Sequence, residues 1–177
     1  GPHKKAFDSR SVPGCAPCHG SHDIRLATDE VLGVGPDAVC SRCHHENQNA
    51  KGYYVAKTMR GLIDSLELSK RYADSLIGDA EQKGMEVADA KFKLRDARQA
   101  RLQSRTMVHA FNEEKFREVI GKGLSVTSIV AEEGQQAIGE YFFRRWGLGI
   151  ATLIITIVAG SLYLTIRRIE KMQARKL

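Results

Sequence analysis

A stretch of 21 residues without a charged side chain, residues 146–166, most constrains what this sequence can form. A helix rises about 1.5 Å per residue, so the stretch reaches roughly 30 Å, the thickness of the hydrocarbon core of a bilayer. Trp146 and Tyr163 lie near its two ends, where aromatic residues favour the membrane–water interface. The alternative is a buried helix of a soluble protein, where uncharged runs of this length are uncommon. The sequence therefore predicts a single transmembrane helix over residues 146–166.

The formal charge of +6 is concentrated after this stretch. Residues 167–177 carry five basic side chains and one acidic one, whereas residues 1–52 are balanced. The basic excess therefore belongs mainly to the tail that follows the membrane helix and does not indicate nucleic-acid binding. By the positive-inside rule, the C-terminus lies in the cytoplasm and residues 1–145 lie in the periplasm, as in a single-pass protein of a bacterial-type inner membrane. No leader is visible, so we expect that one was removed or that the sequence is part of a longer chain.

Residues 53–145 contain no proline, and their apolar residues recur every three or four positions, as on one face of a helix. An interruption is expected near Gly78 or Gly84. The positions that share the helical spacing are Met59, Leu62, Ile63, Leu66, Ala73, Leu76, Ile77, Ala80, Val87, Ala88, Leu94 and Leu102.

The helical pattern resets at Asn112, a predicted N-cap that two acidic residues follow. A second helix is expected from there towards Arg145. Its apolar face consists of Phe116, Val119, Ile120, Leu124 and Ile129. The pattern favours an antiparallel helical hairpin over residues 53–145, whose last helix runs directly into the membrane span.

The first 52 residues have a different composition. All four cysteines and all four prolines lie within the first 43 residues, with few large aliphatic side chains. Such a segment cannot bury enough apolar surface to order itself unaided. Every cysteine belongs to a C-x-x-C pair that histidine follows at once, CAPCH at residues 15–19 and CSRCH at residues 40–44. These two motifs determine what chemistry the segment can support.

Two alternatives to cofactor attachment must be considered for these motifs. Two C-x-x-C pairs can supply four thiolates to one zinc ion, but zinc does not require the histidines, and the pairs lie farther apart than is usual for that site. A disulfide or a thioredoxin-like redox pair is the second alternative. Such a pair is expected beside a strand and helix pattern, which these residues lack.

Covalent haem attachment requires every residue of each motif. Two thiols separated by two residues add across the vinyl groups of one porphyrin, and the following histidine binds the iron. Two macrocycles would also supply the apolar surface that the segment lacks. We therefore predict two covalently bound haem c groups with His19 and His44 as proximal ligands. The attaching thiols are Cys15, Cys18, Cys40 and Cys43.

The first 50 residues resemble the multihaem c-type cytochromes, in which a first motif continues as C-H-G-x-H, here residues 18–22. The helical part is more loosely similar to the C-terminal helices of pentahaem nitrite reductases and octahaem hydroxylamine oxidoreductases. In those enzymes a histidine between two long helices serves as an axial ligand. The sequence VHAF at residues 108–111 occupies the same kind of place.

The resemblance implies candidates for the distal iron ligands. His109 occupies the place of the interhelical ligand, and His3 precedes the first motif by twelve residues, as distal ligands do in several relatives. His22 is expected to reach a neighbouring haem, as the equivalent residue often does. His45 adjoins a proximal ligand and is the weaker candidate. Four candidates for two positions suggest that some bind haems attached upstream or on another chain.

The sequence as a whole predicts a mainly α protein. A haem-organised, loop-rich segment (1–52) precedes the hairpin (53–145), the transmembrane helix (146–166) and a basic cytoplasmic tail (167–177).

The expected function is that of a membrane-anchored multihaem cytochrome c that relays electrons on the extracytoplasmic face, within a respiratory complex. Its partners would be other haem proteins or redox subunits, with quinol as a further candidate. The alternative is the C-terminal part of a nitrite- or hydroxylamine-type enzyme. Its catalytic haem would lie upstream, because neither motif carries the lysine that usually replaces histidine at that haem. The sequence favours an electron carrier over a catalyst.

Overall fold

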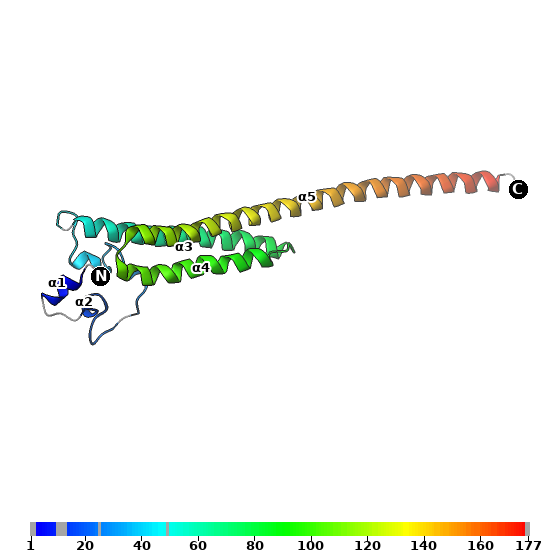
Figure 1. Cartoon of the computed structure of the whole chain (residues 1–177). Helices are drawn as coiled ribbons and strands as arrows, with labels where there is room; N and C mark the ends of the chain where they lie inside the picture. Colours follow the sequence, from blue (N-terminus) through cyan, green and yellow to red (C-terminus); the bar gives the residue numbers. More distant parts are fainter. Residues whose placement is uncertain (1–2, 10–13, 25, 49, 176–177) are drawn as a thin grey trace.

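A computed structural model describes residues 3–9, 14–24, 26–48 and 50–175. This part of the chain is mainly helical, as predicted, and contains no strand beyond an isolated bridge between His45 and Gln48. The N-terminal segment is rich in loops, and Figure 1 shows its short elements gathered at one end of the long helices. These short elements are α1 (Lys4–Asp8), α2 (Ala16–His19) and the 3-10 turns η1 (Asp29–Val31) and η2 (Cys40–Arg42).

Three long helices form an antiparallel bundle: α3 (Ala50–Gln82), α4 (Ala88–Met107) and α5 (Glu113–Ala174). The prediction of a two-helix hairpin is corrected, because the chain reverses direction between α3 and α4 (Figure 1). Gly84 lies in this reversal with φ +77°, a backbone conformation that glycine adopts without steric penalty. The interruption expected near Gly78 or Gly84 therefore occurs at Gly84.

The reversal changes which residues of the later helices are buried. In α3 the predicted face is correct, and Met59 and Leu66 are almost fully buried. In α4 the buried positions are mostly alanines, and Leu102 is 51% exposed, because the spacing of α3 does not continue through the turn. In α5 Ile129 is 48% exposed beside the fully buried Val130. Ala88, at the start of α4, is exposed as well. The predictions that placed Ala88, Leu102 and Ile129 on the apolar face were therefore wrong.

The predicted N-cap of α5 is confirmed, since the Asn112 side chain accepts a hydrogen bond of 3.0 Å from the backbone N–H of Lys115. From there α5 continues for 62 residues, first against the bundle and then beyond it (Figure 1). By length and composition, it is the one helix in the described ranges that could cross a membrane, and its apolar stretch is not buried within the chain. Trp146 is 74% exposed at the start of this stretch. The helix therefore runs directly into the predicted span.

An ion-pair cluster and one apolar side chain fasten the N-terminal segment to the bundle. Leu32 is buried in the apolar cluster at that end of the long helices. Asp29 of η1 accepts hydrogen bonds from Arg101 Nη2 at 2.5 Å and from Arg105 Nε at 3.0 Å, both on α4. Arg101 Nη1 also lies 2.9 Å from Glu67 Oε2 of α3. One carboxylate thus joins the segment that bears the cysteine motifs to two turns of α4.

Replacing Asp29 with asparagine should lower the free energy of unfolding at pH 7 by about 1 to 3 kcal/mol, because three charge-assisted hydrogen bonds from two arginines lose their anion. Burial alone would raise the pKa of Asp29, but Arg101 and Arg105 outweigh it and hold the pKa below its usual value. The stabilisation is therefore complete above the unfolded pKa of about 3.9 and is lost as the pH falls through the folded pKa. Unfolding in detergent at pH 7 and pH 3 measures both effects.

Asp96 offers a control, because it is an exposed carboxylate on α4, the helix of Arg101 and Arg105, with no ion pair in the described part of the chain. Asp96→Asn should leave the stability within about 0.5 kcal/mol of the original. Equal effects of Asp29→Asn and Asp96→Asn would show that the cluster does not fasten the segment.

Candidate functional site

The first motif forms a single helical turn. Cys15 precedes α2, and Pro17 lies in its first turn, where its missing N–H breaks no helical hydrogen bond. The backbone N–H groups of Cys18 and His19 both donate to the carbonyl of Cys15, at 3.2 and 3.0 Å. The turn therefore begins at the first cysteine and includes the histidine.

The second motif forms the same turn in a different sequence context. The backbone N–H groups of Cys43 and His44 both donate to the carbonyl of Cys40, at 3.2 and 2.9 Å. Residues three and four apart in a helical turn lie on the same side of it. In both motifs the two thiols and the imidazole are therefore brought to one face of the backbone, as attachment to one flat cofactor requires.

The two motifs lie close to each other. Burial raises the pKa of the Cys18 thiol, and the nearby Cys40 and Cys43 raise it further, against an opposing effect of Arg42. Cys40 also packs against the apolar cluster at this end of the bundle. None of the four cysteines, all within the described ranges, forms a disulfide. Nor do those ranges bring three or more histidine, cysteine or acidic side chains together as a metal site.

His109 faces the histidine of the first motif. It lies in η3 (Val108–Ala110), between α4 and α5, as the sequence predicted. Its ring centre is 6.1 Å from that of His19, and the ring planes differ by 18°. His109 Nδ1 lies 3.3 Å from the carbonyl oxygen of Thr106, which can only accept, so Nδ1 carries the proton. The lone pair of Nε2 is then available to a metal.

His3 faces the histidine of the second motif. The Nε2 atoms of His3 and His44 are 3.5 Å apart, and their ring centres are 5.8 Å apart. The ring of His3 also packs on Phe111 at 4.4 Å and on Phe7 at 5.5 Å between ring centres. Burial first, and then His44 and the chain terminus, lower the pKa of His3. This lowering favours the neutral form of His3, which is the form that binds a metal ion.

The ring centres of both pairs, and the Nε2 atoms of His3 and His44, have about the separation that one shared metal ion would need. A metal–imidazole bond is about 2 Å long, so two imidazoles on opposite sides of an ion have nitrogens about 4 Å apart and ring centres about 6 Å apart. The four histidines of the two pairs come from four different segments of the chain. The structure thus brings together His19 with His109 and His44 with His3.

The other two candidate ligands, His22 and His45, are not brought to either pair. Both are exposed, and the structure places no other imidazole against them within the described ranges. The backbone of His45 forms the bridge to Gln48. Their expected role as distal ligands, to a neighbouring haem or to haems attached upstream or on another chain, stays a prediction.

Sequence reasoning did not identify Phe7 and Phe111 as the side chains that support His3. Phe7 lies one turn after His3 in α1, a spacing that could have indicated the contact. Phe111 adopts φ +49°, an unusual conformation for a bulky residue, where the chain turns from η3 into α5. No sequence pattern indicated that this turn would meet His3.

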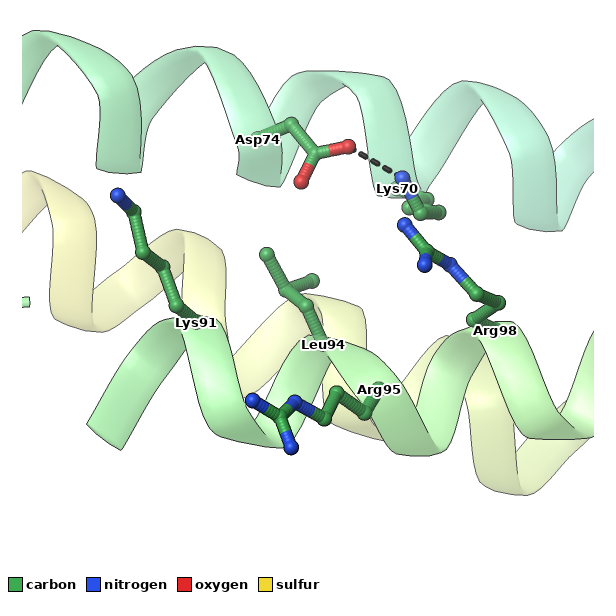
Figure 2. A pocket seen from close by; sticks show the side chains of 6 residues that line it. All are labelled: Lys70, Asp74, Lys91, Leu94, Arg95 and Arg98. Atoms are coloured by element: carbon green, nitrogen blue, oxygen red, sulfur yellow. Dashed lines mark hydrogen bonds and ion pairs between the residues drawn. The ribbon is translucent and has the colours of Figure 1, made fainter. Parts of the chain in front are cut away.

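A groove on the flank of the bundle is separate from the motifs. Figure 2 shows Lys70 and Asp74 of α3 paired with each other across from α4. The other side chains that line the groove come from α4, and they are Lys91, Leu94, Arg95 and Arg98. The groove contains neither cysteine nor histidine, so it takes no part in the histidine pairs.

Comparisons with protein-family models, with curated proteins and with solved structures found no match for this chain. The chemistry of the site is therefore inferred from its own residues. These are two C-x-x-C-H turns with the same pattern of backbone hydrogen bonds, each with a second imidazole near its histidine.

Proposed function

We propose that this protein is a membrane-anchored dihaem c-type cytochrome that relays single electrons on the extracytoplasmic face of a bacterial-type inner membrane. The observation that carries the proposal is the pairing of each motif histidine with a second histidine, His19 with His109 and His44 with His3. C-x-x-C-H motifs alone indicate attachment. The opposed imidazoles add a complete axial ligand set for each of two irons.

The residues present fit the proposed cofactor. Each motif offers two thiols one helical turn apart and a histidine beside them, and none of the four cysteines is used in a disulfide. A zinc site would need four ligands on one ion, and the described residues do not form such a group. A haem iron needs only two axial side chains, one on each face, and each pair supplies two.

Bound haem would supply one-electron redox chemistry at its iron. The chain's own part is to hold the two haem groups in place. Cys15 and Cys18 would attach the first haem, and Cys40 and Cys43 would attach the second. The proximity of Cys18 to Cys40 and Cys43 supports neighbouring attachment sites, a short path for an electron. Imidazole on both faces leaves no position for a substrate, so the geometry favours a carrier over the enzyme alternative.

The long helix α5 supports the membrane part of the proposal. Its exposed apolar stretch follows directly from the bundle, so the motifs would stand away from the bilayer by the length of the three packed helices. Basic residues after this stretch favour a cytoplasmic C-terminus. Partners would then be extracytoplasmic haem proteins or redox subunits. Quinol would reduce these haems only through such a subunit, because the motifs would stand a bundle length away from the bilayer (Figure 1).

Carbon monoxide distinguishes a carrier from a catalyst. The dithionite-reduced protein should bind carbon monoxide at well below one equivalent per chain, and the oxidised protein should show only low-spin haem, because both axial positions are filled. Optical difference spectra and electron paramagnetic resonance measure these two properties. Rapid binding of one equivalent, with a high-spin signal in the oxidised protein, would contradict the carrier and favour the enzyme alternative.

A further inference from the structure

The ring of His44 packs against the backbone of the first turn of α3. A Cβ atom built on Gly52 would lie 2.1 Å from His44 Nδ1, 2.3 Å from Cε1 and 2.8 Å from Cγ. Ordinary contacts of a Cβ atom begin near 3.4 Å, so any side chain at this position would push the ring by about 1 Å or more. With His44 where it is, the position accepts only glycine.

The opposite edge of the same ring faces the second histidine. His44 Nε2 lies 3.5 Å from His3 Nε2, while His44 Nδ1 is buried without a hydrogen-bond partner in the described part of the chain. No hydrogen bond to Nδ1 therefore fixes the rotation of this ring, in contrast to His109, whose Nδ1 donates to Thr106. The ring of His44 is positioned by packing between α3 and His3.

We infer that Gly52 is a positioning residue for the axial coordination of the second haem. Because it has no side chain, the first turn of α3 acts as a flat wall that holds the His44 imidazole with Nε2 directed at His3. The inference rests on the proposed function for its consequence at the iron. The steric relation between Gly52 and His44 stands independently of that function.

A glycine here has an energetic disadvantage that its role would explain. Glycine is a poorer helix former than alanine, and Gly52 lies within α3. Gly61 lies in the same helix, is exposed, and has nothing within 4 Å of an added Cβ. Gly61→Ala therefore provides the same gain in helix propensity without the clash, and serves as a matched control for Gly52→Ala.

Gly52→Ala should leave two haems per chain and convert one of them to a high-spin or carbon monoxide-binding form. The low-spin signal should therefore fall by half. Gly61→Ala should leave both haems low-spin. Optical spectra and electron paramagnetic resonance of the full-length protein in detergent measure the result. Two unperturbed low-spin haems in Gly52→Ala would overturn the inference.

A double-mutant cycle tests the contact without relying on haem spectra. Gly52→Ala should lower the Tm of the original chain, because the added methyl group meets the His44 ring. In a His44→Ala background the same change should raise the Tm. Gly61→Ala should raise the Tm in both backgrounds. If Gly52→Ala changes the Tm equally in both backgrounds, the inference is overturned. This holds even if the Gly52→Ala protein does not bind haem. Absence of haem from the original protein would refute the proposed function instead, and the cycle would still decide whether Gly52 positions His44.

Discussion

Replacing His109 with methionine should raise the midpoint potential of one haem by about 0.1 V or more, within the range of about 0.8 V that axial ligands span. A thioether in place of an imidazole stabilises the reduced iron, and methionine can still reach the position that His109 occupies opposite His19. The second haem should keep its potential, because His3 and His44 are unchanged. A spectroelectrochemical titration of the purified protein measures both potentials.

His22 provides the matched control for this experiment. It lies three residues after His19 and is exposed, but it is not opposed to either motif histidine. His22→Met should leave both potentials and the low-spin spectrum unchanged in the isolated chain. If His22→Met shifts one haem and His109→Met shifts none, then His22 is the distal ligand and the pairing seen in the structure is incorrect.

The features that could be predicted from the sequence depend on neighbouring residues. The uncharged stretch at residues 146–166 predicted a helix able to cross a membrane, because its signal lies in its own composition. Asn112 was recognised as an N-cap from the acidic residues that follow it. Gly84 was one of two glycines expected to interrupt the first helix, since both break the same local pattern.

The features that could not be predicted depend on contacts between distant segments. His3 and His44 are separated by 41 positions, and their pairing depends on how α1 and η2 both meet the end of the bundle. The apolar residues have the same spacing in sequence whether the chain reverses direction at Gly84 or the helix only bends there. The third helix was therefore not predicted. Asp29 binds arginines of α4 that lie more than seventy residues later in the sequence. Nothing in the sequence around an acidic loop residue indicates so distant a partner.

The distal ligands show where the sequence and the structure each contribute. The resemblance to multihaem cytochromes offered His3, His22, His45 and His109 for two positions. Within the described ranges, His3 and His109 are the two whose rings lie near the motif histidines, so the proposed function takes these two as the distal ligands. The motif thiols and their histidines needed no such choice in the proposal, since covalent attachment of haem would use every residue of each motif.

The number of covalently attached haems per chain decides whether this protein is a dihaem c-type cytochrome. The pyridine haemochrome assay measures this number when it is set against protein concentration after acid–acetone extraction of loosely bound haem. A thioether survives this extraction, so only covalently attached haem is counted. We expect two haems per chain in the original protein and one in Cys15→Ala/Cys18→Ala, because that change removes both attachment points of the first motif. Cys40→Ala/Cys43→Ala should likewise leave one. Stoichiometric zinc with no covalent haem in the original protein would contradict the account.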